Sequence, residues 1–219
     1  MRTYPEIPTI YKRGGRGKFL QPPQYATTEL EYLAECEWEW TEKVDGTNIR
    51  VLLSENPPIF GGKTDKAQLP VTLFRYLDER FRDARSPDEL LLFGEGYGAG
   101  SQKGGLYHPG PRFVLFDAWC GGLWLLPDAL AEVATAYALD RVPVIGSGTL
   151  PELRVAVERG FRSKWGEFPA EGIVARPVVQ LLARDGERII TKLKTRDFYP
   201  IARGPRARRE RRDAPTSVC

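Results

Sequence analysis

Two strand-like runs joined by an Asp-Gly pair occupy residues 37–53. The first, E-W-E-W-T-E-K-V, alternates charged and bulky apolar residues, which is the period-two pattern of a half-buried strand. The second, I-R-V-L-L, is rich in β-branched and leucine residues. Because an Asp-Gly pair between two such runs favours a tight turn, we expect an antiparallel hairpin that presents Lys43 and Asn48 at one end.

The remaining patterns predict further strands with helices inserted between them. Apolar residues recur at helical spacing after Pro70, an alanine-rich helix is expected near 128–139, and a capping box precedes a helix over 151–158. Further strands are expected at 90–95, 112–119, 171–177, 178–184 and 188–195. Because strands and helices do not alternate regularly and most strands connect as hairpins, the sequence predicts an α+β fold with mainly antiparallel sheets.

The composition is that of one globular unit. The chain has 219 residues, of which 42% are hydrophobic and 28% charged, so it can bury a substantial core. No apolar run approaches the ~20 residues needed to span a bilayer, and the first residues lack the apolar core of a signal peptide, so we expect a cytoplasmic protein. Three widely spaced cysteines and a single histidine argue against a disulfide framework or a zinc site.

Positive charge is concentrated at the end of the chain. Residues 203–219 hold six arginines and two acidic residues, whereas the whole chain has a net charge of +3. We expect this segment to be disordered, either as a contact for nucleic-acid phosphates or only as a solubilising tail. Lys12, Arg13 and Lys103 lie in loop-like segments and are also candidates for backbone contacts, although basic loop residues are often merely solvated.

Lys43 is the strongest candidate nucleophile. A lysine amine attacks phosphorus only in its neutral form, so burial or neighbouring cations must lower its pKa. Lys192 and Lys194 lie two residues apart on a predicted strand, so both should point to the same side. Together they would bind an anion such as triphosphate and lower the pKa of Lys43, unless they lie on an ordinary solvated strand face.

Two glutamates and one phenylalanine extend this set of candidates. Glu95 and Glu171 lie at the ends of predicted strands, where a carboxylate could hold a divalent metal ion or accept hydrogen bonds from ribose. Phe116 could stack on a purine, although the apolar run around it is equally typical of a buried core. Taken together, these residue types favour a nucleotide site.

Five strings occur in a fixed order: Lys-Val-Asp-Gly (43–46), Gly-Glu-Gly (94–96), Phe-Asp (116–117), Glu-Gly-Ile-Val (171–174) and Lys-Leu-Lys (192–194). In identity and order they resemble the covalent nucleotidyltransferases, which include ATP-dependent polynucleotide ligases and mRNA capping enzymes. The resemblance covers most of residues 4–198. Two features resemble RNA ligases of the bacteriophage RNA ligase 2 type. One is Asn48, where DNA ligases and capping enzymes typically have arginine. The other is the pair of strings F-G-G-K-T-D-K-A-Q-L-P and G-E-G-Y-G-A-G-S-Q-K-G-G.

The resemblance implies an adenylyltransferase domain over 1–202 and an ATP-dependent RNA ligase. Lys43 would attack the α-phosphorus of ATP, release pyrophosphate and form lysyl-AMP. The AMP would pass to a 5′-phosphate end, which the 3′-OH of a second RNA strand would then attack. Lys192 and Lys194 would hold the α-phosphate, and Glu171 would place Mg²⁺ or Mn²⁺, through water.

The same resemblance implies a nucleoside site. Glu42 would help to recognise adenine, and Phe116 would stack on it. Glu95 would bind ribose, and Asn48 would lie near the ribose and the incoming 5′-phosphate. A monomer is expected, acting in the host cytoplasm if a phage encodes it.

Two departures from the family pattern remain. Lys63 stands where the family usually has arginine, so the charge is kept but the bidentate geometry is lost, which puts engagement of the RNA strands in question. Only 25 residues follow Lys194, so no separate C-terminal ligase domain is expected. Two alternatives stay open: a ligase for DNA or hybrid nicks, and an RNA-end-binding protein that joins nothing, against which the intact Lys43 argues.

Overall fold

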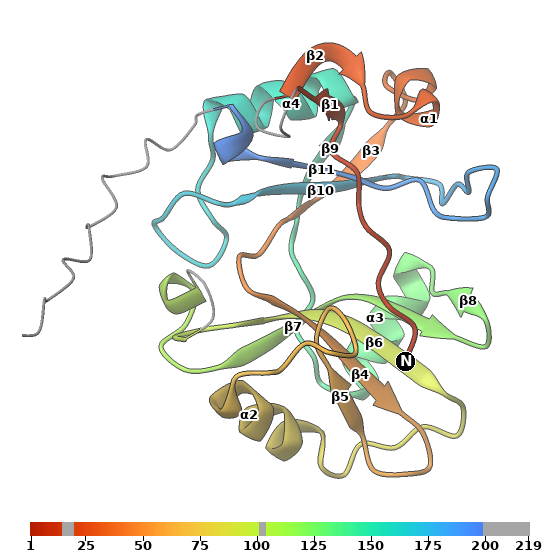
Figure 1. Ribbon diagram of the computed structural model, residues 1–219, viewed down its shortest axis with the longest axis vertical. Coiled ribbons are helices and arrows are strands. Elements are labelled where there is room, and N and C mark those ends of the chain that lie inside the picture. Colours follow the sequence, from red (N-terminus) through yellow and green to blue (C-terminus); the bar gives the residue numbers. More distant parts are fainter. Residues whose placement is uncertain (15–19, 101–103, 199–219) are drawn as a thin grey trace, which may run out of the picture.

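Two antiparallel sheets form the body of the protein. The computed structural model describes residues 1–14, 20–100 and 104–198. A four-stranded sheet and a five-stranded sheet lie one above the other along the long axis (Figure 1). A small ribbon of β1 (Tyr11–Arg13) and β2 (Leu20–Tyr25), together with the short helix α1 (Thr28–Tyr32), lies at the four-stranded end. The predicted α+β class with mainly antiparallel sheets is confirmed.

The four-stranded sheet has the order β11-β10-β3-β9. Its strands are β3 (Trp38–Glu42), β9 (Val144–Gly148), β10 (Gly172–Pro177) and β11 (Thr191–Lys194). One face packs on α1 and α4 (Leu150–Arg159) through a core that contains Trp38, Leu153 and Leu193. The predicted capping box at the start of α4 is present. By strand alternation, the opposite face of this sheet carries Arg176, Lys192 and Lys194.

The five-stranded sheet has the order β5-β4-β6-β7-β8. Its strands are β4 (Thr47–Leu53), β5 (Ile59–Gly61), β6 (Leu90–Tyr97), β7 (Arg112–Cys120) and β8 (Leu123–Trp124). The helices α2 (Val71–Phe81) and α3 (Pro127–Ala136) contribute Leu77 and Leu130 to one core with Ile49 and Leu115 of the sheet. None of the helices in the described ranges is long and apolar enough to cross a membrane.

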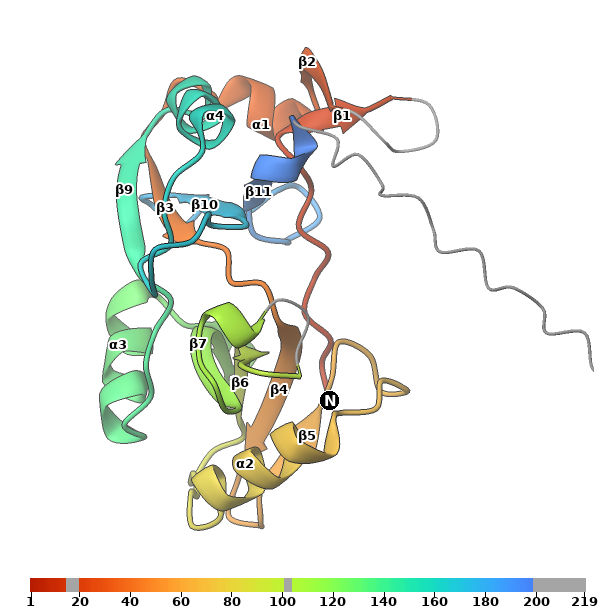
Figure 2. The same cartoon turned by 90° about the vertical axis from the view of Figure 1, so that its left-hand side faces the viewer.

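The hairpin predicted for residues 37–53 is wrong. β3 pairs with β9 and β10 of one sheet, whereas β4 pairs with β5 and β6 of the other. Each strand buries its apolar side chains in a different core, with Trp38 in one and Ile49 in the other. Residues 43–46 therefore form a linker that crosses between the sheets, as both views show (Figure 2).

The strand predicted for residues 178–184 is also wrong. Only Leu182 forms a β-bridge, with Arg188, and Val178, Val179 and Leu182 are exposed. Without a neighbouring strand to pair with or a core to cover them, β-branched and leucine residues alone do not make a strand.

A buried arginine ties the start of the chain to the five-stranded sheet. Arg50, in β4, is fully buried. Its Nε donates to the carbonyl of Gly62 at 2.7 Å, and its Nη1 donates to the carbonyls of Met1 and Arg2 at 3.0 and 3.3 Å. Its Nη2 pairs with Asp65 at 2.8 Å. Arg50 therefore holds both the N-terminal residues and the loop that carries Lys63.

We expect Arg50→Met to lower the free energy of unfolding by about 2–4 kcal/mol, because several backbone carbonyls lose their charged donor. Asp65→Asn should lower it much less, because an ion pair at an exposed carboxylate is screened by solvent and the Asp65 side chain is 71% exposed. Urea denaturation of both variants measures the difference. Equal losses would mean that the ion pair, rather than the bonds to the backbone, stabilises this region.

Candidate active site

A cavity of about 320 Å³ lies where the linker crosses between the two sheets. Its size is within the usual range for a small-molecule site. Eight residues singled out from the sequence line it: Glu42, Lys43, Asn48, Lys63, Glu95, Phe116, Lys192 and Lys194. Glu171 joins this group through its contacts with two of the lysines. Lys12 and Arg13 line a neighbouring groove, whereas Lys103 and residues 203–219 lie outside the described residues.

Three adjacent strands bring the lysines together. The backbone N–H of Lys43 donates to the carbonyl of Gly172 at 2.9 Å, and Gly172 lies opposite Lys194 in the β10–β11 pair. Lys192 and Lys194 line the cavity, whereas Leu193 between them points into the core. A side chain at Gly172 would collide with the backbone of Leu193, so the close approach of these strands requires glycine.

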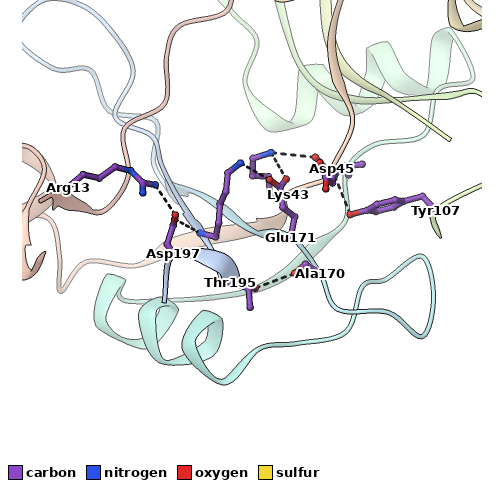
Figure 3. A network of polar contacts seen from close by, with 10 residues as sticks. Arg13, Lys43, Asp45, Tyr107, Ala170, Glu171, Thr195 and Asp197 are labelled. Atoms are coloured by element: carbon purple, nitrogen blue, oxygen red, sulfur yellow. Dashed lines mark hydrogen bonds and ion pairs between the residues drawn. The ribbon is translucent and has the colours of Figure 1, made fainter. Parts of the chain in front are cut away.

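One carboxylate is shared by two of the lysines. Glu171 Oε2 accepts a hydrogen bond from Lys43 Nζ at 2.6 Å, and its Oε1 accepts one from Lys194 Nζ at 2.6 Å (Figure 3). Burial alone would raise the pKa of Glu171, but the two ammonium groups hold it below its ordinary value. The carboxylate thus fixes the distance between the candidate nucleophile and a candidate phosphate ligand.

The cavity carries an excess of positive charge around Lys192. The pKa of Lys192 is lowered first by burial and then by the like charges of Lys194, Lys43 and Lys63. Ammonium groups gathered in this way are stabilised when an anion lies between them. This part of the cavity is therefore suited to phosphate groups.

The cavity also has two buried oxygen acceptors that lack partners among the described residues. Glu42 Oε2 accepts the backbone N–H of Lys164 at 2.7 Å, but its buried Oε1 has no partner among the described residues. Asn48 Oδ1 is likewise buried without a partner in the described part of the chain. Because buried polar atoms are nearly always paired, these two oxygens indicate a ligand with hydrogen-bond donors, such as an amino group or ribose hydroxyls.

Glu95 lies directly opposite Asn48 in the β4–β6 pair. Burial raises the pKa of its carboxylate to about 7, against the opposing effects of Lys43 and of the nearby backbone N–H of Gly46. A side chain at position 46 would collide with the backbone of Gly96. The linker can therefore pass this close to β6 only because residue 46 is glycine. The path of the linker at Gly46 and the position of the Glu95 side chain therefore depend on one another.

This raised pKa predicts a pH-dependent stability. Between the ordinary value of 4.5 and about 7 the folded protein binds more protons at Glu95 than the unfolded chain does. The free energy of unfolding should therefore fall as pH rises through this window, by up to about 3 kcal/mol. Urea denaturation from pH 4.5 to 8 should show this slope in the wild type and a flatter one in Glu95→Gln. The exposed Glu55→Gln is the matched control, and parallel curves for all three proteins would contradict the assignment.

A β-bulge aims Phe116 at the cavity. In the β6–β7 pair, Phe93 lies opposite Asp117 and Gly94 lies opposite Leu115, so Phe116 has no partner. The extra residue shifts the alternation of β7, and Phe116 and Asp117 both lie off the core that holds Leu115. Phe116 packs against the cluster of Leu91, Phe93 and Trp124 and also lines the cavity, where its ring is available to a ligand.

Several residues of the site were not found from the sequence. Tyr4 lines the cavity and packs edge-on against Phe116, with ring centroids 5.0 Å apart. The Tyr4 hydroxyl donates to Asp117 at 2.8 Å, and Asp117 is also paired with Arg188. No local pattern indicates these contacts, which join distant segments. Arg176 lines the cavity as well, and strand alternation from Val174 could have placed it there.

The carboxylates do not form a metal site by themselves. Across the described ranges, no group of three or more His, Cys, Asp or Glu side chains could hold a metal ion. Magnesium often binds through one or two carboxylates together with substrate phosphates. Glu171, next to the lysine cluster, and Glu95 fit that arrangement if the phosphates of a nucleotide complete the coordination.

A sequence profile of RNA ligases matches residues 36–194, which include the linker lysine, the shared glutamate and the β11 lysines. The chain belongs to the RNA ligase family. The family match spans both sheets and ends at Lys194. It therefore covers every residue that lines the cavity except residues 4–7 of the N-terminal segment. Among curated proteins, no match to the chain was found.

Solved structures of an RNA ligase share the fold. A mutant of the Naegleria gruberi RNA ligase with ATP and manganese matches with a TM-score of 0.60 and 19% identity, over 87% of this chain and 61% of that chain. The same ligase with pyrophosphate matches with a TM-score of 0.58 and 18% identity, and a mutant with AMP and manganese matches with a TM-score of 0.56 and 18% identity. Both matches cover 87% of this chain and 61% of that chain. This member of the RNA ligase family thus spans about 61% of the length of the structures that it resembles.

Proposed function

We propose that the protein is an ATP-dependent RNA ligase that works through a lysyl-AMP intermediate. The observation that carries the proposal is the position of Lys43, which lies on the linker between the sheets, 2.6 Å from the carboxylate that also binds Lys194. A nucleophile at the edge of a cationic, partly closed cavity fits attack on a nucleotide phosphate. Family membership supports the proposal, and the structural relatives with ATP or AMP support it further.

The nucleoside would bind at the end of the cavity that holds the unpaired acceptors. The exocyclic amino group of adenine would donate to Glu42 Oε1, which has no partner among the described residues. Phe116 would stack on the base, with Tyr4 limiting its position from the side. Asn48 and Glu95, which lie opposite each other on the adjacent strands β4 and β6, would accept hydrogen bonds from the ribose hydroxyls.

The phosphates would bind at the lysine end of the cavity. Lys192 and Lys194 would hold the α-phosphate and stabilise the negative charge that builds up on it during attack. The Lys43 amine, having lost a proton, would form a bond to phosphorus while the bond to pyrophosphate breaks. Bound Mg²⁺ or Mn²⁺ would neutralise phosphate charge, with Glu171 as a ligand directly or through water.

RNA ends would be the partners of the adenylylated protein. A 5′-phosphate oxygen would displace Lys43 from phosphorus, and the 3′-OH of the other strand would then displace AMP. Lys63 would assist the engagement of the strands, and Lys12, Arg13, Lys103 and the arginines of residues 203–219 would add contacts to the phosphate backbone. We further propose a monomer of the bacteriophage RNA ligase 2 type with its adenylyltransferase domain in residues 1–202.

Incubation with α-labelled ATP and Mg²⁺, followed by denaturing electrophoresis, tests this function. We expect label on the protein, transfer of the label to a nicked RNA duplex with a 5′-phosphate, and loss of the label as the nick closes. A DNA duplex with the same nick should be sealed more slowly. Label that never leaves the protein would refute the joining activity, and an unlabelled protein would refute the nucleotide chemistry altogether.

A further inference from the structure

An aromatic cluster lies directly behind one wall of the cavity. It consists of four rings packed around aliphatic side chains, namely Tyr97, Tyr107, Trp165 and Phe168 around residues that include Val44 and Val142. Both valines also line the cavity, whereas the four rings do not. The cluster therefore supports the wall of the site without reaching the space that a nucleotide would fill.

Tyr107 is the ring that contacts all the others. It follows the 3-10 turn η2 (Gly104–Leu106) and is buried. Its ring centroid lies 5.9 Å from that of Tyr97, 5.6 Å from that of Trp165 and 4.8 Å from that of Phe168. All three pairs are edge-to-face, which is a favourable geometry for aromatic rings. Rings from different segments thus fix the position of the Tyr107 hydroxyl.

This hydroxyl holds the linker that carries the candidate nucleophile. The linker lies outside the strands, so its backbone N–H groups need partners other than the strand ladders. The N–H of Lys43 donates to the carbonyl of Gly172, and the N–H of Asp45 donates to the hydroxyl of Tyr107 at 3.2 Å (Figure 3). Val44, between them, is buried in the cluster. The backbone is therefore fixed on both sides of Val44.

A loop over residues 161–170 supplies the other two rings that contact Tyr107. Two backbone hydrogen bonds, of 3.0 and 2.9 Å, close this loop on itself. Trp165 and Phe168 extend from it into the cluster. The loop leads directly into Glu171, the carboxylate that two lysines share. Its position is therefore tied both to the cluster and to the lysine end of the cavity.

The same loop orients the carboxylate that we propose to recognise adenine. The backbone N–H of Lys164, next to Trp165, donates to Glu42 Oε2 at 2.7 Å. This bond leaves the buried Oε1 without a partner among the described residues, as a contact to an amino group requires. If the loop moved, Glu42 would lose its donor and could turn. The packing of Trp165 thus affects the direction in which Glu42 points.

We infer that the aromatic cluster positions two parts of the active site at once. Tyr107 positions the linker that carries Lys43. Trp165 positions the loop whose backbone orients Glu42. The inference rests on the proposed function and deepens it, because alignment of the nucleophile and selection of the base then depend on one set of packed rings. Alignment matters because a displacement of about 1 Å can cost about 10²-fold in rate.

Tyr107→Phe tests the nucleophile half, because it removes the hydroxyl and keeps the ring. Single-turnover labelling over a range of ATP concentrations should show a rate constant about 10-fold lower, with the apparent dissociation constant for ATP unchanged. The matched control is Tyr137→Phe, since the Tyr137 hydroxyl also bonds to the backbone, at the carbonyl of Arg85, but far from the linker in sequence and outside the cavity lining. The control should label at the wild-type rate.

Trp165→Leu tests the base half, because the smaller side chain frees the loop. The measurement is the ratio of kcat/KM for ATP to that for inosine triphosphate, whose base lacks the amino group. The wild type should prefer ATP, since a site built to bind this group rejects an analogue without it. We expect Trp165→Leu to lower the preference by about 10-fold, and Trp165→Phe to lower it less. Glu167→Ala, an exposed change in the same loop, should keep the wild-type ratio.

Thermal melting of every variant separates positioning from packing, and Trp165→Phe carries the base half if Trp165→Leu does not fold. A Tyr107→Phe protein that melts earlier but keeps the wild-type rate constant would overturn the nucleophile half. Trp165 variants with the wild-type preference would overturn the base half. A wild type that takes label equally from both nucleotides would overturn the contact between Glu42 and adenine. A wild type that takes no label from ATP would instead overturn the proposed function.

Discussion

Lys43→Ala should lose self-adenylylation by about 10⁴-fold or more, because no other group replaces a missing nucleophile. In the structure, Lys43 is placed by its backbone bond to Gly172 and by the ion pair with Glu171, so no neighbouring lysine lies in the same position. The measurement is the rate at which label from α-labelled ATP becomes bound to the protein.

Lys66→Ala serves as the control for this experiment, because Lys66 is an exposed lysine that does not line the cavity. It should label at the wild-type rate. The Lys43→Ala protein should still bind ATP, since the base, the ribose and the α-phosphate would keep their own contacts. Label on Lys43→Ala comparable to that on the wild type would show that another residue is the nucleophile.

Lys194→Ala should reduce the rate constant of self-adenylylation by ~10²–10³-fold, which is the usual loss when one group that stabilises transition-state charge is removed. Lys194 lines the cavity and shares the carboxylate of Glu171 with Lys43. Its loss therefore removes a phosphate ligand and also leaves Glu171 with a single cation. Single-turnover labelling at saturating ATP measures the rate constant separately from binding.

Lys192→Ala provides the comparison. Lys192 lines the same cavity but shows no ion pair in the described part of the chain, so its loss should weaken phosphate stabilisation without disturbing the Lys43–Glu171 pair. We expect a loss of similar size in the rate constant. If either variant changed only the KM for ATP, the lysine would act in ground-state binding and not in the transition state.

The local sequence predicted those parts of the site that depend on residue type and strand alternation. Lys192 and Lys194 both line the cavity because side chains two apart on a strand share a face. The cap of α4 is equally local, since Thr149 and Glu152 bond to each other's backbone N–H groups. In both cases the deciding contacts lie within a few residues.

The position of Phe116 shows where local reasoning stops. An apolar run in the middle of a sheet is compatible with a core residue and with a ligand-stacking residue. The bulge opposite Phe93 and Gly94 decides between them, because it leaves Phe116 unpaired at the cavity. A bulge depends on the register with β6, which the sequence of β7 alone does not contain.

The sequence by itself determined the identity and order of the chemical groups, the α+β class, and the alternation that pairs Lys192 with Lys194. Only the tertiary structure decided that β3 and β4 belong to different sheets, so that Lys43 lies on a linker between them and not in a hairpin. The physical reason is that strand partners are chosen by long-range burial. Trp38 and Ile49 each enter a core built from distant segments, and this gain outweighs the local preference of an Asp-Gly turn.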